Sequence, residues 1–425
     1  MADDEVVTRL LARLMSEPGE NVPTGLFGRA RRTASAALRT GTSALLRGGM
    51  LDARTAERLA LSLGELKGIA MKVGQILSYL DTPLPEETRR VLAVLQVKSQ
   101  PTPFGKIEQI IREDFGPRAD ALLSKMDRVP VSTASIGQVH RAGGLAVKVL
   151  HPGIEQAIRS DFKAAAAGRV LAKMIMPGGD IDSVIDEARE TFLAECDYVA
   201  ERRWQERFAA LQAGNPDVSI PAVHAEWCSG RVITTAWVDG IRFHDFAASA
   251  SQRARDRAGR ALYEFYVGSV YRHGLFNADP HPGNLLFAED GRLTVLDYGC
   301  VREFDERMRA GIKALSKAVR ADDGPAIRRA LVELGGAPPD DKTFPHTRSM
   351  LRGFFGPTLE PGPHRIESGF NADMRTILVD KRAVLRMRLP GRLLFLFRIR
   401  FGLHSELAKL RSVVDWAALE AELVG

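Results

Sequence analysis

The chain has 425 residues, of which 45% are hydrophobic and 26% are charged, and its formal net charge is +6. This length and composition exclude a disordered or fibrous chain and predict two or three folded domains. The net charge is small and no basic run is interleaved with aromatic residues, so a nucleic-acid partner is not expected.

The N-terminal residues, the apolar stretch near the C-terminus and the cysteines indicate the cellular compartment. The chain begins with the acidic run M-A-D-D-E, whereas a signal peptide needs a basic start. The most apolar stretch, residues 393–403, contains two arginines and falls short of the roughly 18 uncharged residues that span a bilayer. Cys196, Cys228 and Cys300 lack metal-ligand spacing and favour a reducing compartment. We therefore expect a cytoplasmic protein without a membrane span.

Residues 1–54 are expected to form a partly ordered basic leader. Within them, residues 22–51 contain five arginines and no acidic residue. One interpretation is a basic helix lying on an anionic bilayer. The alternative, a leader packed on the next domain, is favoured because large apolar residues are few and Gly41, Gly48 and Gly49 interrupt the pattern.

Residues 55–125 are expected to form a helical extension. Apolar spacing predicts helices over 52–80, 86–97 and 104–115, separated by proline-containing breaks. The first helix contains the string K-V-G-Q from Lys72 to Gln75. A glycine in mid-helix is unfavourable by about 1 kcal/mol against alanine, which indicates a close approach to the backbone or a helix crossing.

Strand patterns begin near residue 129 and include L-A-V-K-V-L, with Lys148 as its fourth residue. This string has the form of the kinase strand whose lysine pairs the α- and β-phosphates of ATP. The preceding loop keeps only the last glycine of the kinase pattern G-x-G-x-x-G-x-V, because Ser132 and Ala134 replace the first two. A Cβ there keeps the backbone from closing fully on phosphate. The expected loop contacts to nucleotide are Ser132, Ala134, Ser135, Gly137 and Val139.

A long helix is predicted from residue 181 to about 212, and it carries Glu195, Asp197 and Glu201. Asp197 and Glu201 would share one helix face. A kinase uses one helix carboxylate to hold its strand lysine, and the sequence leaves open which of the three contacts Lys148. A strand over 232–238 then leads into Asp239-Gly240 as a hinge, where Trp237 and Val238 are expected to contact the nucleotide.

The most informative stretch is N-A-D-P-H-P-G-N, followed by a D-Y-G string. Asp279 precedes Asn284 by five positions, the spacing of the kinase catalytic loop, and Asp297 opens the D-Y-G. Between them, a strand, an Asp-Gly turn and a second strand predict a hairpin that brings Asn284 and Asp297 together. Asp279 would act as catalytic base, and Asn284 and Asp297 would hold Mg²⁺ against the phosphates of ATP or ADP.

These patterns predict an α+β fold of the two-lobed protein-kinase type. Residues 126–238 would form a small β-rich lobe with a long helix, and residues 239–425 a helical lobe. After the D-Y-G string the pattern is helical to the end, with Pro/Gly-rich interruptions at 335–345 and 356–363.

The K-V-G-Q helix, the loop A-S-I-G-Q-V-H-R-A, the strings A-V-K-V, H-P-G and E-C-D, and A-D-P-H-P-G-N with D-Y-G resemble the UbiB/AarF/ADCK atypical kinases over roughly residues 55–410. The resemblance implies that Lys72 and Gln75 lie on a helix that folds over the active site, excludes protein substrates and faces Glu195 and Asp197. It also implies that Glu201 pairs with Lys148 and that Ala134 tunes nucleotide preference.

The resemblance further implies a role in ubiquinone or other isoprenoid-lipid metabolism. The implied partners are a nucleotide, an isoprenoid lipid or quinone precursor, an anionic membrane surface and lipid-biosynthesis proteins. Peripheral attachment to the inner face of a membrane would accompany the cytoplasmic location. Family members often have a fuller Ala-Ala-Ala where this chain has S-T-A, and some bacterial members carry C-terminal membrane spans.

Two protein-kinase features are missing from the sequence, and their absence restricts which molecule could accept the phosphoryl group. No arginine precedes Asp279, and no A-P-E motif follows the D-Y-G string, so a platform for protein substrates is not evident. We expect an ATPase or a kinase of a lipid or small molecule. One alternative is a small-molecule phosphotransferase of the aminoglycoside or choline type. The other is a nucleotide-switched scaffold for a lipid-biosynthesis complex.

Overall fold

The computed structural model describes residues 101–134, 136–160, 189, 193–336, 340–367 and 391–425. The basic leader, the helices predicted over 52–80 and 86–97, Lys72, Gln75 and Ser135 lie outside these residues. The chain divides into two compact units. The first contains the described residues up to Ala200 together with His224–Trp237, and the second contains Glu201–Val223 and Val238–Gly425.

The first unit is built on an antiparallel sheet in the order β1-β2-β3-β5. Its strands are β1 (Ser132–Thr133), β2 (Gly137–Ala142), β3 (Leu145–Leu150) and β5 (Val232–Ala236). A Gly143-Gly144 turn joins β2 to β3, and Gly143 has a φ of +61° that suits glycine. Lys148 lies opposite Val139 on one side and Ile233 on the other, so it is in the third strand of the sheet.

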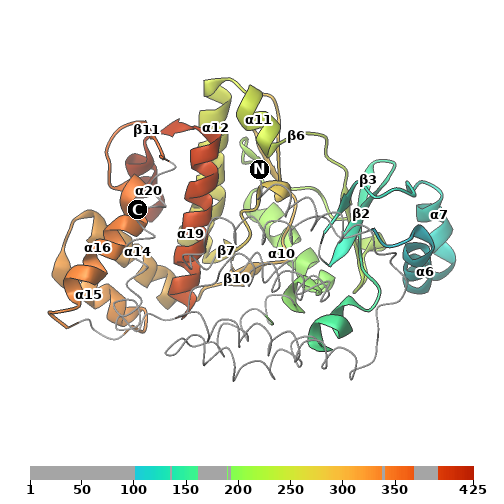
Figure 1. The fold of residues 1–425 in the computed structure, drawn as a ribbon, viewed down its shortest axis with the longest axis horizontal. Coiled ribbons are helices and arrows are strands. Elements are labelled where there is room, and N and C mark those ends of the chain that lie inside the picture. Colours follow the sequence, from blue (N-terminus) through green and yellow to red (C-terminus); the bar gives the residue numbers. More distant parts are fainter. Residues whose placement is uncertain (1–100, 135, 161–188, 190–192, 337–339, 368–390) are drawn as a thin grey trace, which may run out of the picture. The chain divides into compact units, whose positions relative to one another are not determined.

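Helices cover one face of this sheet (Figure 1). They are α6 (Phe104–Phe115), the 3₁₀ turn η1 (Gly116–Arg118) and α7 (Ala119–Leu123), with a further 3₁₀ turn, η2 (Ala225–Trp227), before β5. Ile107 and Ile111 of α6 pack in one cluster with Val147 and Val149 of β3. Because side chains alternate along a strand, Lys148 points to the opposite face.

The long helix predicted over 181–212 is wrong at Asp197. The chain leaves the helical conformation at Cys196 and Asp197, and α10 (Tyr198–Leu211) begins after them. The carboxylate of Asp197 accepts a hydrogen bond from the amide of Ala200 at 2.9 Å, which is the role of an N-cap residue. Asp197 therefore precedes the helix that carries Glu201 and does not share a helix face with it.

The second unit contains a sheet in the order β4-β9-β8-β6 and a two-stranded ladder, β10-β7. Its first part contains α11 (Phe243–Ser249), α12 (Gln252–Tyr263), the π-helical segment η3 (Glu264–Gly268), α13 (Ser269–His273) and the 3₁₀ turn η4 (Pro282–Asn284). The strands are β4 (Val218–Ser219), β6 (Ile241–Arg242), β7 (Leu275–Asn277), β8 (Leu285–Phe287), β9 (Leu293–Val295) and β10 (Val301–Glu303).

The rest of this unit is mainly helical, as predicted. The helices are α14 (Glu306–Arg320), α15 (Gly324–Glu333), α16 (Phe344–Phe355), η5 (Gly356–Thr358), α19 (Gly391–Leu410) and α20 (Trp416–Val424). The short strands β11 (His364–Arg365) and β12 (Val413–Val414) pair antiparallel. Helix α19 runs beside α12 (Figure 1). Among the described helices, none combines the length and apolarity needed to span a bilayer.

A buried ion pair lies in the core of the second unit. Arg400 of α19 is 5% exposed and Glu420 of α20 is fully buried, with 3.2 Å between Nη1 and Oε1. Glu420 also accepts hydrogen bonds from the hydroxyls of Tyr271 at 2.6 Å, Ser316 at 2.9 Å and Tyr263. Burial acts to raise the pKa of Glu420, but Arg400 and the hydroxyl donors hold that pKa below its usual value. The carboxylate is therefore kept ionised in the core.

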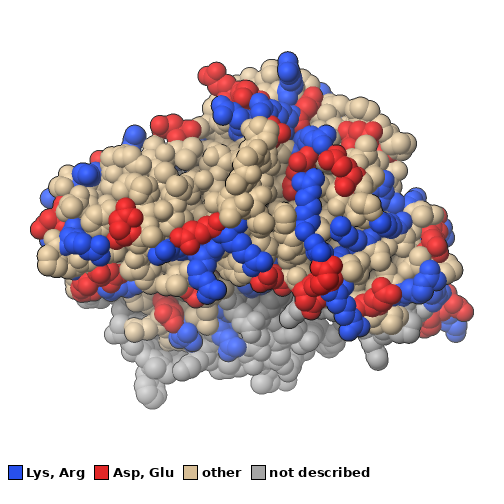
Figure 2. Space-filling view, turned by 180° about the vertical axis from the view of Figure 1, so that it is seen from behind, with Lys and Arg blue, Asp and Glu red and all other residues tan. Residues whose placement is uncertain are grey.

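Charged side chains of both signs are interspersed on the described part of the face seen in Figure 2. Ion pairs occur on the surface of the described residues, such as Arg112 with Glu108 at 2.8 Å and with Asp120 at 2.7 Å. Exposed pairs of this kind contribute little to stability, about 0–1 kcal/mol each.

Candidate functional site

Asp279 and Asn284 meet in the second unit. The chain leaves β7 at Asn277, and His281 shapes the η4 turn by accepting a hydrogen bond from the Gly283 amide at its Nδ1, at 3.0 Å. Asn284 then donates from Nδ2 to the Oδ2 atom of Asp279 at 2.8 Å. Since the Asn284 amide nitrogen is used in this bond, its oxygen remains as the atom that could bind a cation.

The β8–β9 hairpin brings Asp297 next to Asn284, as the pattern predicts. Leu285 pairs with Val295, and the amide of Leu296 donates to the carbonyl of Asn284 at 2.9 Å. Asp297 is the next residue, and its Oδ1 accepts from the Gly299 amide at 2.9 Å. Two carboxylates and an amide oxygen therefore come from one short segment of chain.

Asn277 joins the two loops that carry these groups, and the sequence analysis assigned it no role. Its side chain is 1% exposed. Its Oδ1 accepts from the amide of Asp279 at 3.1 Å, and its Nδ2 donates to the carbonyl of Asp297 at 2.9 Å. In the β7–β10 ladder, Asn277 also pairs with Val301. The sequence feature that could have identified Asn277 is a polar residue at the end of an otherwise apolar strand.

The π-helical segment η3 supports the same loop from within the core. Tyr266 lies on this segment, and its hydroxyl donates to the carbonyl of Asp279 at 3.3 Å. Burial, together with the nearby Asp279 and Asp297, raises the pKa of Tyr266 well above its usual value, so the hydroxyl remains a donor. The tyrosine of the D-Y-G string, Tyr298, is fully buried against Phe208.

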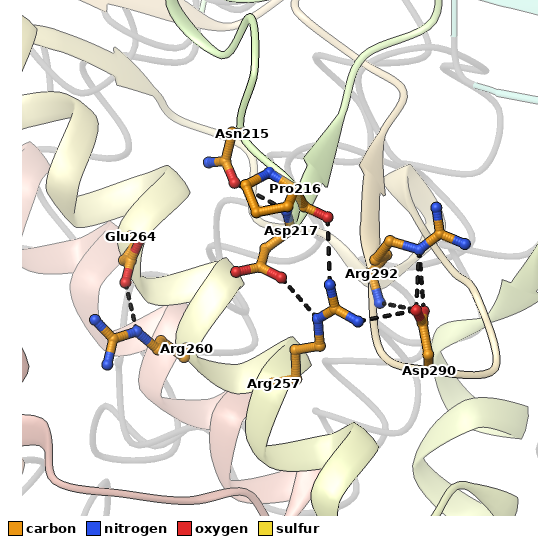
Figure 3. A network of polar contacts seen from close by, with 8 residues as sticks. All are labelled: Asn215, Pro216, Asp217, Arg257, Arg260, Glu264, Asp290 and Arg292. Atoms are coloured by element: carbon orange, nitrogen blue, oxygen red, sulfur yellow. Dashed lines mark hydrogen bonds and ion pairs between the residues drawn. The ribbon is translucent and has the colours of Figure 1, made fainter.

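The far end of the hairpin is fastened to helix α12 (Figure 3). Arg257 donates to Asp290 in the hairpin turn at 2.8 Å and to Asp217 before β4 at 2.6 Å. Gly291 has a φ of +91°, and a Cβ at this position would collide with the carbonyl of Ala254 on α12. The hairpin is thus held at its turn, away from Asn284 and Asp297.

Arg257→Ala is expected to loosen the hairpin, because it removes the ion pairs that join α12 to Asp290 in the hairpin turn and to Asp217 before β4. We expect amide hydrogen exchange in β8 and β9 to become about two- to fivefold faster. Arg260→Ala is the matched control, since Arg260 lies on the same helix and pairs with Glu264 and Glu422, which are outside the hairpin. Equal exchange rates in the two variants would contradict the assigned role of Arg257.

In the first unit, the loop expected to contact nucleotide is a tight turn. The amide of Ala134 donates to the carbonyl of Gly137 at 2.8 Å, and the side chains of Ser132 and Ala134 are exposed. A Cβ on Gly137 would lie 2.7 Å from the Tyr198 hydroxyl. Close packing against the sheet and α10 therefore explains this glycine. Nucleotide contacts of Ser132, Ala134, Gly137 and Val139 stay predictions.

The remaining predicted residues also have defined surroundings. The ammonium of Lys148 lies 5.1 Å from the ring centroid of Tyr198. Glu201 is 2% exposed, and it belongs to the second unit, so its pairing with Lys148 stays a prediction. Glu195 is half-buried, and Asp197 is exposed.

The predicted hinge follows β5. The amide of Trp237 donates to the carbonyl of Gly144 at 2.8 Å, and its ring lies 4.7 Å from the guanidinium carbon of Arg141. The amide of Trp237 is therefore already used within the first unit. Contacts of Trp237 and Val238 with a nucleotide stay predictions.

Asp279, Asn284 and Asp297 fit magnesium by the chemistry of their donor atoms. Mg²⁺ prefers hard oxygen ligands and is held by one or two carboxylates with water and substrate phosphates. By contrast, no group of three or more His, Cys, Asp and Glu that could bind a metal occurs in the described part of the chain.

A β-rich unit with a strand lysine, and a helical unit with this loop and hairpin, define the class of kinase-like proteins. The chain belongs to the ABC1 atypical kinase-like family, whose family model matches residues 94–331. The family and the fold class predicted from the sequence are both confirmed.

Several curated relatives carry corresponding names. AarF domain-containing protein kinase 1 of Xenopus laevis is 29% identical over 66% of this chain and 56% of its own length. The mitochondrial atypical kinase COQ8 of Saccharomyces cerevisiae is 27% identical over 63% and 54%. The chain thus spans about half the length of these relatives.

A solved structure covers more of the chain. The Rv3197–erythromycin complex of Mycobacterium tuberculosis is similar with a TM-score of 0.63 and 28% identity, over 87% of this chain and 95% of that one.

Proposed function

We propose that this atypical kinase binds ATP with Mg²⁺ and transfers its γ-phosphoryl group to water, a lipid or a small molecule. The observation that carries the proposal is the contact of Asn284 with Asp279, next to Asp297 on the same hairpin. Kinase-type chemistry needs these groups because catalysis depends on positioning and on neutralising phosphate charge.

Each residue has a distinct part in this proposal. Asp279 would orient the attacking hydroxyl and accept its proton, and its main chain is held by Asn277 and Tyr266. Asn284 and Asp297 would hold Mg²⁺, which supplies positive charge at the phosphates when bound. Lys148 would pair the α- and β-phosphates. The exposed Ala134 would set the preference between ATP and ADP.

We infer isoprenoid-lipid metabolism, including ubiquinone-related metabolism, as the setting, because relatives are named COQ8 and AarF domain-containing kinases. Attachment to an anionic membrane surface and contact with lipid-biosynthesis proteins belong to this inference. A second candidate is a small-molecule phosphotransferase. The erythromycin complex of the similar Rv3197 structure favours it, since that protein binds a hydroxylated small molecule.

The test is phosphate release by the full chain with Mg-ATP, with and without anionic liposomes, a quinone-precursor mimic or erythromycin. We expect release that EDTA abolishes and that one of these additions increases. Phosphorylated erythromycin would favour the second candidate. Absence of Mg-ATP binding in calorimetry, or steady phosphorylation of added proteins, would refute the proposed function.

A further inference from the structure

His151, directly after β3, lies between the nucleotide loop and Thr102. Its Nδ1 is 2.8 Å from the Thr102 hydroxyl, and its Nε2 is 3.2 Å from the carbonyl oxygen of Ala134. Its own amide donates to the carbonyl of Ile136 at 2.8 Å. One residue therefore contacts the loop at two points, Ala134 and Ile136.

The chemistry of the partners fixes the tautomer of this ring. A carbonyl oxygen only accepts, so the hydrogen must be on Nε2 and be donated to Ala134. Nδ1 is then an acceptor, and the hydroxyl of Thr102 is its donor. Burial lowers the pKa of His151, which favours this neutral form. Thr102 thus orients the ring that holds Ala134.

Gln138 in turn holds Thr102. Its Oε1 accepts from the Thr102 amide at 2.7 Å, and its Nε2 donates to the Thr102 carbonyl at 3.2 Å. The second Nε2 hydrogen reaches Nε2 of His140 at 2.8 Å, while Nδ1 of His140 contacts the Asp127 carbonyl at 2.7 Å. Gln138 and His140 are fully buried. Both hydrogens and the oxygen of the Gln138 side-chain amide are therefore used. The bonds to Gln138 fix the main chain of Thr102 in a single position.

We propose that Thr102, Gln138 and His151 are positioning residues that fix the nucleotide loop at Ala134. The inference rests on the proposed nucleotide binding and adds the residues that set the loop's conformation. The exposed Ala134 is then held by its amide to Gly137 and by its carbonyl to His151. A loop held in this way binds phosphate without first being ordered, which strengthens affinity.

Thr102→Val tests the proposal, since it nearly keeps the shape of the side chain and replaces the hydroxyl with a methyl group that cannot donate a hydrogen bond. We expect Mg-ATP binding to weaken by about 3–10-fold in calorimetry, the range for one lost hydrogen bond. Thr102→Ser should restore binding. The matched control is Ser229→Ala, which removes a half-buried hydroxyl of the same unit that donates to Asp114 at 2.6 Å, accepts from the amides of Arg231 and Val232, and has no bond to Thr102 or His151 among those of the described residues. It should stay within about twofold of the parent protein.

A double-mutant cycle separates positioning from a general loss of stability. If Thr102 acts through His151, then Thr102→Val should not weaken binding further in a His151→Ala background. Additive losses, or equal effects of Thr102→Val and Ser229→Ala, would overturn the proposal. A parent protein that does not bind Mg-ATP would instead refute the proposed function, so the two failures are distinguishable.

Discussion

Asp279→Asn is expected to lower Mg-dependent phosphate release by about 10²–10⁴-fold, the contribution typical of a general base. Asparagine has nearly the same shape and keeps an oxygen for the bond from Asn284, so the loop should retain its structure. Because Asp279 is not proposed to bind the nucleotide, calorimetry should give a similar affinity for Mg-ATP. Turnover and binding are measured on the same preparation.

Glu289→Gln is the matched control for this variant. Glu289 is an exposed carboxylate on the same segment, between β8 and β9, and its replacement should leave turnover unchanged. Turnover of Asp279→Asn within about tenfold of the parent would contradict the role of Asp279 as base. Full support of growth by Asp279→Asn in cells that need this protein, with loss of support in Lys148 and Asp297 variants, would favour the nucleotide-switched scaffold.

Glu420→Gln is expected to lower the free energy of unfolding of the second unit by about 3–5 kcal/mol, because it leaves Arg400 charged and buried without a counter-charge. The substitution preserves volume, so packing alone predicts a small effect. Urea denaturation followed by circular dichroism at neutral pH measures the difference.

Glu422→Gln, two residues further along α20, provides the comparison. Its carboxylate is exposed and pairs with Arg260 at 3.1 Å and Arg272 at 3.8 Å. Exposed ion pairs contribute at most about 1 kcal/mol, so this variant should remain close to the parent. Similar losses in the free energy of unfolding in the two variants would show that burial of the Arg400–Glu420 pair does not determine its contribution to stability.

Local patterns predicted much of the fold and of the candidate site. Alternation and the Asp290-Gly291 turn identified the hairpin, and the L-A-V-K-V-L string identified the strand of Lys148. These elements are specified by residues near one another in the chain. Their positions could therefore be predicted without knowledge of the tertiary structure.

Residues that act through distant contacts were missed. Asn277 becomes informative only when β7 pairs with β10, and Gln138 and His151 only when Thr102 packs beside them, 36 and 49 positions away in the chain. The predicted helix through Asp197 failed for the opposite reason. The helical periodicity of the sequence continues through residues 196 and 197. The helix itself is interrupted there, because the Asp197 side chain caps the start of α10.

The bridge formed by Asn277 has a consequence for drug discovery. Its side chain donates to the Asp297 carbonyl and accepts from the Asp279 amide, and the Ala278 amide donates to the Cys300 carbonyl, so the segment of Asp297 is tied to the segment of Asp279. An inhibitor that works by displacing the main chain at Asp297 would have to break these bonds, each worth roughly 0.5–1.5 kcal/mol. Compounds that leave Asp297, the proposed magnesium ligand, in its present position are the better starting chemistry for this protein.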